Sequence, residues 1–535
     1  MSVKVRIDGI DYEAQEGKLL IDVCADNGID VPHFCYHPGL GPDGNCRMCQ
    51  VEFVTARGSR LGVSCKATVT DGMEVLTQSE QAKRARASVE EFLLLNHPLD
   101  CPICDKAGEC TLQNYYMEHD LEDSRMDFTR HKKGKAMDIG PTLILDQERC
   151  VLCDRCVRFL RDVAGDPQLH IASRGHAAFI TTFPGQEVTS AYSLNTVDLC
   201  PVGALTAKDF RFASANWFMK NTPTVCTTCS RGCSMQLQTR PDENRVVRFR
   251  PRHNAEVNGY WSCDGGRLDY HFVNENRITR PFVRTDDNIF ECSQQEAIGS
   301  MRTALGLTPA GKVEGSGSAK AVLLASATCT LEELYLLKRI GNDLLSAPVF
   351  VARHIPDGVE DDLLRRADRH PNVRGAELLG LQVVDFTGDG PAANPVRDAL
   401  GAQGVLVCVG FNRHVTPGVY AAVDHAARVI ALSACETRLT EAADVVIPGL
   451  TWAEKDGLVV NFEGHVQRLK AGMHAEGVSE WKILDNFIAS LTGSEAHEFV
   501  THIRQAIGSS ESAFAGVDLA KVGPHGTRAT AQPVG

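Results

Sequence analysis

Cysteines are the residues of this sequence whose number and spacing could do chemistry. The chain of 535 residues contains 20 cysteines, and sixteen of them lie before residue 264. Residues 1–13 lack the basic start and apolar stretch of a signal peptide, so we expect a reducing compartment. Clustered cysteines there indicate metal binding or redox chemistry rather than disulfides.

The first candidate ligand set is Cys35, Cys46, Cys49 and Cys65, spaced C-x10-C-x2-C-x15-C. One close pair with two outlying cysteines suits a [2Fe–2S] centre wrapped in a loop. Four thiolates would also hold tetrahedral zinc.

The residues before this set favour iron. Residues 3–7 and 10–13 alternate around Asp8-Gly9, which predicts a β-hairpin. A short helix is expected from about Leu19 to Asn27, ended by Gly28. This order of hairpin, helix and cysteine loop is typical of small β-grasp ferredoxins.

The second set is His97, Cys101, Cys104 and Cys110. Three cysteines and one histidine is also a common structural zinc composition. In an iron–sulfur cluster, a neutral imidazole in place of a thiolate would raise the reduction potential, as it does in Rieske centres.

A helix is predicted to position His97. Thr77 and Glu80 have capping-box spacing. The apolar residues that follow recur at helical intervals, and Asn96-His97-Pro98 is expected to end the helix. The predicted apolar face consists of Ala82, Ala85, Val89, Phe92 and Leu93.

The third set is Cys150, Cys153, Cys156 and Cys200, the last followed by Pro201. The run C-x2-C-x2-C opens a bacterial ferredoxin cluster, and a remote Cys-Pro supplies the fourth ligand. Two-cluster ferredoxins have a further cysteine where this chain has Leu160. We therefore expect the run to serve one [4Fe–4S] cluster.

The fourth set is Cys226, Cys229, Cys233 and Cys263, spaced C-x2-C-x3-C-x29-C. A zinc knuckle is the alternative to a [4Fe–4S] cluster here. The remaining cysteines are single and are assigned no role, since free cysteines are usually small buried apolar residues. They are Cys24, Cys292, Cys329, Cys408 and Cys435.

From about residue 320 the pattern changes to that of an α/β domain. Residues 320–326, 349–352, 405–409 and 445–447 read as buried strands, and residues 331–345 as a helix. Parallel strands are therefore expected. The last ~25 residues are rich in Gly, Ala and Ser and are expected to be loosely held.

Composition restricts the functional class. The net charge is -13, and the chain is 43% hydrophobic and 23% charged, which is ordinary for a globular protein. A nucleic-acid partner is not expected from this charge. No apolar run reaches the ~18 residues of a membrane span.

Taken in order, the ligand sets resemble those of the G subunit of bacterial NADH–quinone oxidoreductase, an iron–sulfur subunit of respiratory complex I. The resemblance covers at least residues 1–275. It implies that His97 and its three cysteines hold a [4Fe–4S] cluster, that the first set holds [2Fe–2S], and that the third and fourth sets hold [4Fe–4S]. Some bacterial members carry the fourth set and others lack it.

The rest resembles the molybdopterin oxidoreductase domain of this family. Residues 443–448, 454–457 and 461–468 are similar to its late motif. Metal-dependent enzymes usually place Lys where this chain has Gly265, and only 67 residues follow Arg468. We therefore expect a truncated scaffold without a molybdenum cofactor.

The resemblance implies a multidomain α+β and α/β fold. The expected domains are 1–78 ([2Fe–2S] ferredoxin-like), 79–120 ([4Fe–4S] held by one histidine and three cysteines), 121–215 (ferredoxin-like [4Fe–4S]), 220–276 ([4Fe–4S] of molybdopterin oxidoreductase type), 277–505 (truncated molybdopterin oxidoreductase-like) and 506–535 (tail).

The implied function is electron relay from an NADH-oxidising flavoprotein subunit towards quinone, with no substrate site in this chain. The clusters of Cys150 and His97 would form the main route, with the [2Fe–2S] centre beside its entry and the Cys226 cluster off the path. Implied partners are the flavoprotein, a downstream iron–sulfur subunit and other complex I subunits, on the cytoplasmic side of the inner membrane. The alternatives are an NAD-linked hydrogenase or formate dehydrogenase subunit, a molybdenum formate dehydrogenase, or a zinc-based interaction module.

Overall fold

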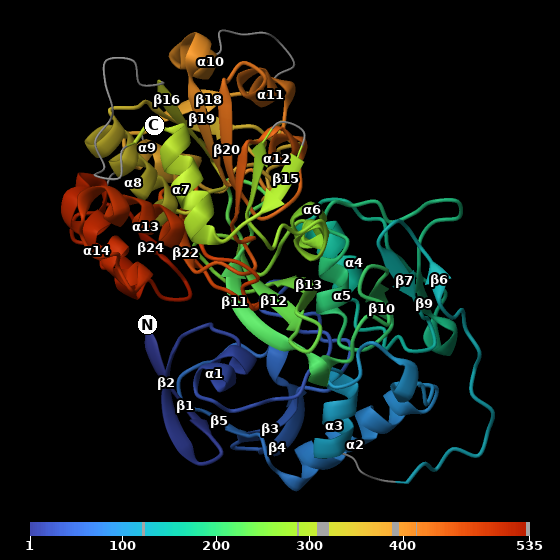
Figure 1. Cartoon of the computed structure of the whole chain (residues 1–535). Coiled ribbons are helices and arrows are strands. Elements are labelled where there is room, and N and C mark those ends of the chain that lie inside the picture. The colour runs from blue at the N-terminus through green and yellow to red at the C-terminus, as the bar shows by residue number, and fades with distance from the viewer. Residues whose placement is uncertain (120–122, 286–287, 308–319, 388–394, 414, 531–535) are drawn as a thin grey trace. The chain divides into compact units, whose positions relative to one another are not determined.

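The chain folds into two compact units, Met1–Met219 and Lys220–Gly535. The computed structural model describes residues 1–119, 123–285, 288–307, 320–387, 395–413 and 415–530 (Figure 1). In these ranges no helix is long and apolar enough to cross a membrane.

The first unit begins with a five-stranded sheet in the order β2-β1-β5-β3-β4. The strands are β1 Ser2–Ile7, β2 Ile10–Gln15, β3 Gln50–Thr55, β4 Gly58–Val63 and β5 Met73–Leu76, and helix α1 is Leu20–Asp26. β1 pairs antiparallel with β2 and parallel with β5, a β-grasp arrangement. The alternating apolar residues of β1 and one face of α1 share a core.

The predicted hairpin and first helix are confirmed. Ile7 and Ile10 pair across the turn at Asp8-Gly9. Gly28 has φ 72° after the end of α1, a backbone conformation that glycine adopts without a steric penalty.

Helix α2, Glu80–Leu94, corrects two details of the prediction. Its N-cap is Ser79, which accepts from Ala82 N, because Thr77 is held instead by the Asp8 carboxylate. Phe92, expected on the buried face, is 74% exposed. The buried positions include Arg86, whose guanidinium donates to Gln50 O at 3.0 and 2.8 Å.

Short elements complete the first unit. Helices are α3 Thr111–His119, α4 Arg155–Arg158 and α5 Asn195–Leu199. Strands are β6 Met137–Asp138, β7 Leu143–Leu145, β8 His170–Ala172, β9 Phe179–Thr181 and β10 Leu205–Ala207. β10, β7 and β6 form one sheet, and β8 and β9 form a hairpin.

The second unit begins with a three-stranded antiparallel sheet and continues into an eight-stranded sheet. The former contains β11 Lys220–Val225, β12 Ser234–Arg240 and β13 Arg245–Pro251, followed by α6 Asp264–Leu268. The strands of the latter are β14 Phe282–Thr285, β15 Asn288–Glu291, β16 Ala321–Ser326, β17 Val349–Arg353, β18 Gln382–Asp385, β19 Val405–Val409, β20 Arg428–Ser433 and β21 Val445–Pro448.

The large sheet confirms the predicted parallel α/β domain. Strands β18-β17-β16-β19-β20-β21 are neighbours in that order and pair in parallel. This is the doubly wound order, with its switch point between β16 and β19. Two buried apolar clusters lie on its two faces, and helices cover both (Figure 1). The helices are α7 Gln294–Ala304, α8 Leu331–Arg339, α9 Val373–Leu378, α10 Pro395–Leu400, α11 Pro417–Val423, α12 Arg438–Ala442, α13 Glu480–Thr492 and α14 Val500–Ser510.

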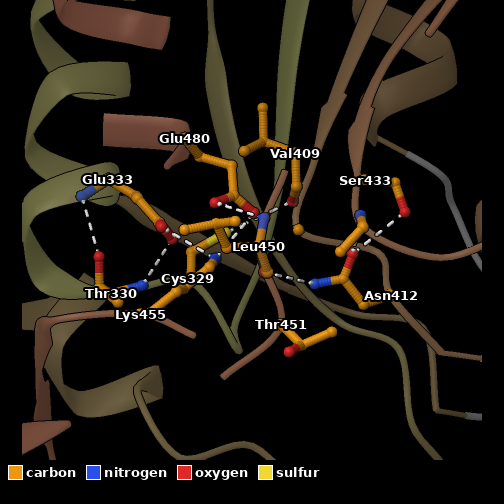
Figure 2. A network of polar contacts seen from close by, with 12 residues as sticks. Cys329, Thr330, Glu333, Val409, Asn412, Ser433, Leu450, Thr451, Lys455 and Glu480 are labelled. Atoms are coloured by element: carbon orange, nitrogen blue, oxygen red, sulfur yellow. Dashed lines mark hydrogen bonds and ion pairs between the residues drawn. The ribbon is translucent and has the colours of Figure 1, made fainter. Parts of the chain in front are cut away.

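A buried ionic network joins α8, α13 and the loop after β21. Lys455 Nζ lies 2.9 Å from Glu333 Oε1 and 2.8 Å from Glu480 Oε1. Figure 2 shows these side chains converging beside Cys329. Cys329 itself donates to Val409 O at 3.4 Å, so it is packed within the network as a small buried residue.

The expected loose tail is wrong for the described residues up to 530. Phe514 is fully buried, and Leu519 and Val522 are also buried. β24, Thr527–Arg528, extends the small sheet of β22 Gly457–Val460 and β23 His465–Leu469. Residues 531–535 lie outside the described part. This segment is held by a few buried apolar side chains, which are too widely spaced to form a recognisable pattern in the sequence.

Candidate iron–sulfur centres

The first ligand set lies in the loops at one end of the β-grasp sheet. Cys35 and Cys46 precede β3, Cys49 adjoins it, and Cys65 is in the 3-10 turn Ser64–Lys66 after β4. Gly44 at φ 84° and Arg47 at φ 60° turn the loop around Cys46. The four thiols are thus brought from three loop segments to one place.

The thiols of this set are in mutual contact. Hydrogen bonds from Cys46 and Cys65 lower the pKa of the Cys35 thiol. A hydrogen bond with Cys65 lowers the pKa of Cys49 to about 7. Cys35 N–H also donates to Cys46 Sγ at 3.4 Å. Four interacting, mostly buried sulfurs fit a [2Fe–2S] centre.

The second set lies between α2 and α3. Cys101 is in the 3-10 turn Cys101–Ile103, Cys104 follows it, and Cys110 immediately precedes α3. The Cys104 thiol interacts electrostatically with those of Cys101 and Cys110. The three cysteines are therefore grouped.

His97 lies just beyond α2, as predicted, with its N–H donating to Leu94 O at 3.2 Å. Burial, with Arg149 as the second cause, lowers the pKa of His97 to about 4. Its imidazole is therefore neutral, the form that binds metal. Arg149 also interacts with Cys104, so one guanidinium connects the histidine with the cysteines.

The third set surrounds a single cavity. Cys150, Cys153, Cys156 and Cys200 all line it, together with Asp154, Pro201 and apolar side chains. Leu152 and Asp154 have left-handed φ of 52° and 65°, which turns the chain on both sides of Cys153. Burial raises the pKa of the Cys150 and Cys153 thiols to about 12. Four convergent, buried thiols fit a cluster, whose iron would deprotonate them.

The fourth set lies at the end of β11 and the start of α6. Cys226 N–H donates to Cys233 O at 2.8 Å, and Cys263 is the N-cap of α6, accepting from Gly266 N at 3.3 Å. A Cβ on Gly266 would be 2.9 Å from Cys226 Sγ. The Cys233 thiol interacts with those of Cys226, Cys229 and Cys263. These thiols also fit a cluster.

Across the described ranges, no three His, Cys, Asp or Glu side chains are placed to hold a single metal ion.

Sequence reasoning missed the residues that connect the sets. Gly203 lies against Cys104, and Thr111 N donates to Pro201 O at 2.9 Å, which joins the third set to the second. Arg155 and Arg158 join the third set to the first. For Arg155 and Arg158, the only signal in the sequence is their position on either side of Cys156.

Family models match the chain in the order of the ligand sets. Residues 1–80 match a 2Fe-2S iron–sulfur cluster binding domain and residues 86–125 an NADH-ubiquinone oxidoreductase-G iron–sulfur binding region. Residues 140–206 match the ferredoxin-like domain of NADH-quinone oxidoreductase subunit 3. Residues 219–275 match a molybdopterin oxidoreductase Fe4S4 domain, and residues 420–489 match molybdopterin oxidoreductase.

Curated relatives are similar over much of the chain. The G subunit of NADH-quinone oxidoreductase from Streptomyces coelicolor is 35% identical over 85% of this chain and 53% of that protein. The NADH-ubiquinone oxidoreductase 75 kDa subunit of Reclinomonas americana is 34% identical over 72% of this chain and 55% of that protein. NADH-quinone oxidoreductase subunit 3 of Thermus thermophilus is 37% identical over 57% of this chain and 42% of that protein. The chain thus spans about half the length of these relatives.

Among solved structures, an NAD+-reducing [NiFe]-hydrogenase in the H2-reduced state is 30% identical, over 40% of this chain and 91% of that chain. Its TM-score of 0.37 is too low to establish a common fold. The family models and the curated relatives confirm the resemblance expected from the sequence: the chain is similar to the G subunit of NADH-quinone oxidoreductase over most of its own length and matches iron–sulfur domain models, two of which are described for that enzyme.

Proposed function

We propose that the chain is an iron–sulfur electron-transfer subunit of an NADH:quinone oxidoreductase. It receives electrons from an NADH-oxidising flavoprotein subunit and passes them to a downstream iron–sulfur subunit, towards quinone. The observation that carries this proposal is the contiguity of three ligand sets within one compact unit. The Cys153 thiol interacts electrostatically with Cys35, and Gly203, three residues after Cys200, lies against Cys104.

The proposed cofactors are one [2Fe–2S] and three [4Fe–4S] clusters. The [2Fe–2S] centre belongs to Cys35, Cys46, Cys49 and Cys65. The [4Fe–4S] centres belong to His97, Cys101, Cys104 and Cys110; to Cys150, Cys153, Cys156 and Cys200; and to Cys226, Cys229, Cys233 and Cys263. When bound, the clusters supply one-electron transfer without bond-making to a substrate.

The chain's own residues set the properties of these centres. Buried apolar walls, such as Leu145 and Ile180 around the Cys150 set, exclude water. Backbone N–H groups donate to sulfur, as Leu152 N does to Cys150 Sγ at 3.4 Å. Both burial and hydrogen bonding to sulfur tune reduction potential.

The large α/β domain is proposed to be a scaffold without a molybdenum cofactor. By resemblance, Gly265 stands where metal-dependent enzymes of this type usually place lysine. Near the switch point of the sheet, Lys455 forms ion pairs with Glu333 and Glu480.

We propose that the subunit lies on the cytoplasmic side of the inner membrane, attached through other subunits.

Anaerobic isolation of the chain with its copurifying subunits tests the proposal. We expect about 14 iron atoms per chain with matching acid-labile sulfide, negligible zinc and molybdenum, and a flavoprotein that reduces the clusters with NADH. Zinc without sulfide would contradict the cluster assignment, and bound molybdenum would contradict the scaffold. A copurifying hydrogenase or formate dehydrogenase subunit would favour the alternative of an NAD-linked enzyme of that kind.

A further inference from the structure

Two arginines of α4 lie buried between the first and third ligand sets. Arg155 immediately precedes Cys156, and Arg158 follows it by two residues. Arg155 is 9% exposed and Arg158 is 5% exposed. Both side chains therefore carry their charge out of water, which is costly unless an opposite charge is close.

The hydrogen bonds of these guanidinium groups lead to the loop of the [2Fe–2S] set. Arg158 donates to Cys35 O, and also to Gly41 O at 3.2 Å and Leu40 O at 3.4 Å. Arg155 donates to Tyr36 O and, at 3.3 Å, to Leu199 O beside Cys200. The two side chains thus tie the helix of one ligand set to the loop of another.

All of these acceptors are neutral backbone carbonyls. Within the described residues neither guanidinium makes an ion pair with a carboxylate, and the Nε of each has no hydrogen-bond partner. Asp154 interacts with Arg158 at longer range, and its Oδ1 is itself buried without a partner. In the part of the chain that the structure describes, two buried positive charges therefore lack a carboxylate in direct contact.

The sulfur ligands supply the missing negative charge. Arg155 interacts electrostatically with the thiol of Cys153. Arg158 holds the backbone of Cys35, the residue that also interacts with Cys153. Clusters bound by four thiolates are net negative, and their net charge is one of the determinants of their potential.

We propose that Arg155 and Arg158 are positioning residues whose buried charges are balanced by the two clusters and raise the reduction potentials of both. The inference rests on the proposed cluster assignment. A nearby fixed positive charge stabilises the reduced, more negative state of a cluster, and burial protects this interaction from screening by salt. Arg155 acts mainly on the Cys150 centre and Arg158 mainly on the [2Fe–2S] centre.

The test is an EPR-monitored redox titration of the assembled complex with Arg155→Gln or Arg158→Gln. We expect the ratio of reduced to oxidised cluster, at the wild-type midpoint, to fall about tenfold for the nearer cluster. Arg161→Gln is the matched control, because Arg161 lies on the same segment but is exposed and paired with Asp162 at 2.7 Å. Its titration should match the wild type.

Lysine variants keep the proposal testable if a glutamine variant does not load iron. Arg155→Lys and Arg158→Lys retain the charge, so they should load and titrate close to wild type. Unchanged midpoints in loaded glutamine variants would overturn the proposal. Loss of iron from the lysine and glutamine variants alike would also overturn the proposal. It would show that the planar shape of the guanidinium group is required and that its charge is not sufficient. Absence of both cluster signals from the wild-type protein would instead refute the proposed function.

Discussion

Gly203 lies so close to Cys104 that a Cβ built on it would be 2.1 Å from Cys104 Sγ. The segment that carries Cys200, the proposed fourth ligand of one centre, is therefore in contact with Cys104, a proposed ligand of the next. In Gly203→Ala the added methyl group would overlap the Cys104 sulfur, so we expect Cys104 to be displaced. Overpacking of this kind lowers the free energy of unfolding by about 1–3 kcal/mol.

We expect this variant to lose about four iron atoms per chain, with loss of the EPR signal of the His97 centre. Gly299→Ala in α7 is the control, because a Cβ there meets nothing within 4 Å. Full iron content in Gly203→Ala would show that the close contact relaxes without affecting the ligand set.

Cys153→Ala and Cys229→Ala test the proposal that the Cys150 centre is on the electron route and the Cys226 centre is not. Cys153 belongs to the set that contacts both neighbouring sets, so its removal should abolish NADH-to-quinone electron flow. Cys229→Ala should destabilise residues 226–263 and leave much of the turnover. The measurement is NADH:quinone activity at matched assembly. Equal loss in both variants would place the Cys226 centre on the route.

His97→Cys should lower the reduction potential of its centre. The imidazole is neutral, so a thiolate in its place adds one negative charge and favours the oxidised state. Cysteine is a competent ligand, so the cluster should still assemble. A redox titration followed by EPR measures the shift. An intact cluster with an unchanged potential would show that His97 is not a ligand.

Glu480→Gln should change how stability depends on pH. Burial, partly opposed by Lys455, raises the pKa of Glu480 from 4.5 to about 7. The folded state then holds a proton that the unfolded chain releases, so this contribution is complete below about pH 4.5 and is lost as the pH rises towards 7. Chemical denaturation at pH 5 and pH 7.5 should show a smaller decrease for Glu480→Gln than for wild type. Equal decreases would mean that Glu480 is ionised throughout.

The sequence predicted the elements that carry a strong local signal. The hairpin around Asp8-Gly9, the helix from Leu331 and the buried strands β16, β17, β19 and β21 all form. The chain also contains β18 and β20, which we did not predict. β18 has polar residues at both ends and lies at the edge of the sheet, so its apolar run is short.

What the sequence did not reveal depends on contacts distant in the chain. Thr77 has the spacing of a cap, but Asp8, 69 residues away, holds it. Arg86 of α2 is buried and donates to Gln50 O, 36 residues away. Arg155 and Arg158 flank Cys156, and their burial between two ligand sets likewise depends on contacts with the distant residues Cys35 and Tyr36. Spacing identifies candidate ligands, whereas the groups between ligand sets are determined by tertiary structure.

The buried arginines of α4 also bear on how the protein matures. A chain that has not yet received iron and sulfide holds the charges of Arg155 and Arg158 beside thiols that remain protonated, since burial raises the pKa of Cys153 to about 12. Loading provides the anions, and the energy of metal binding then becomes energy of folding for this region. With the proposed ligand sets, insertion at one centre would secure the loop of the other, and biogenesis of the two centres would be a cooperative event.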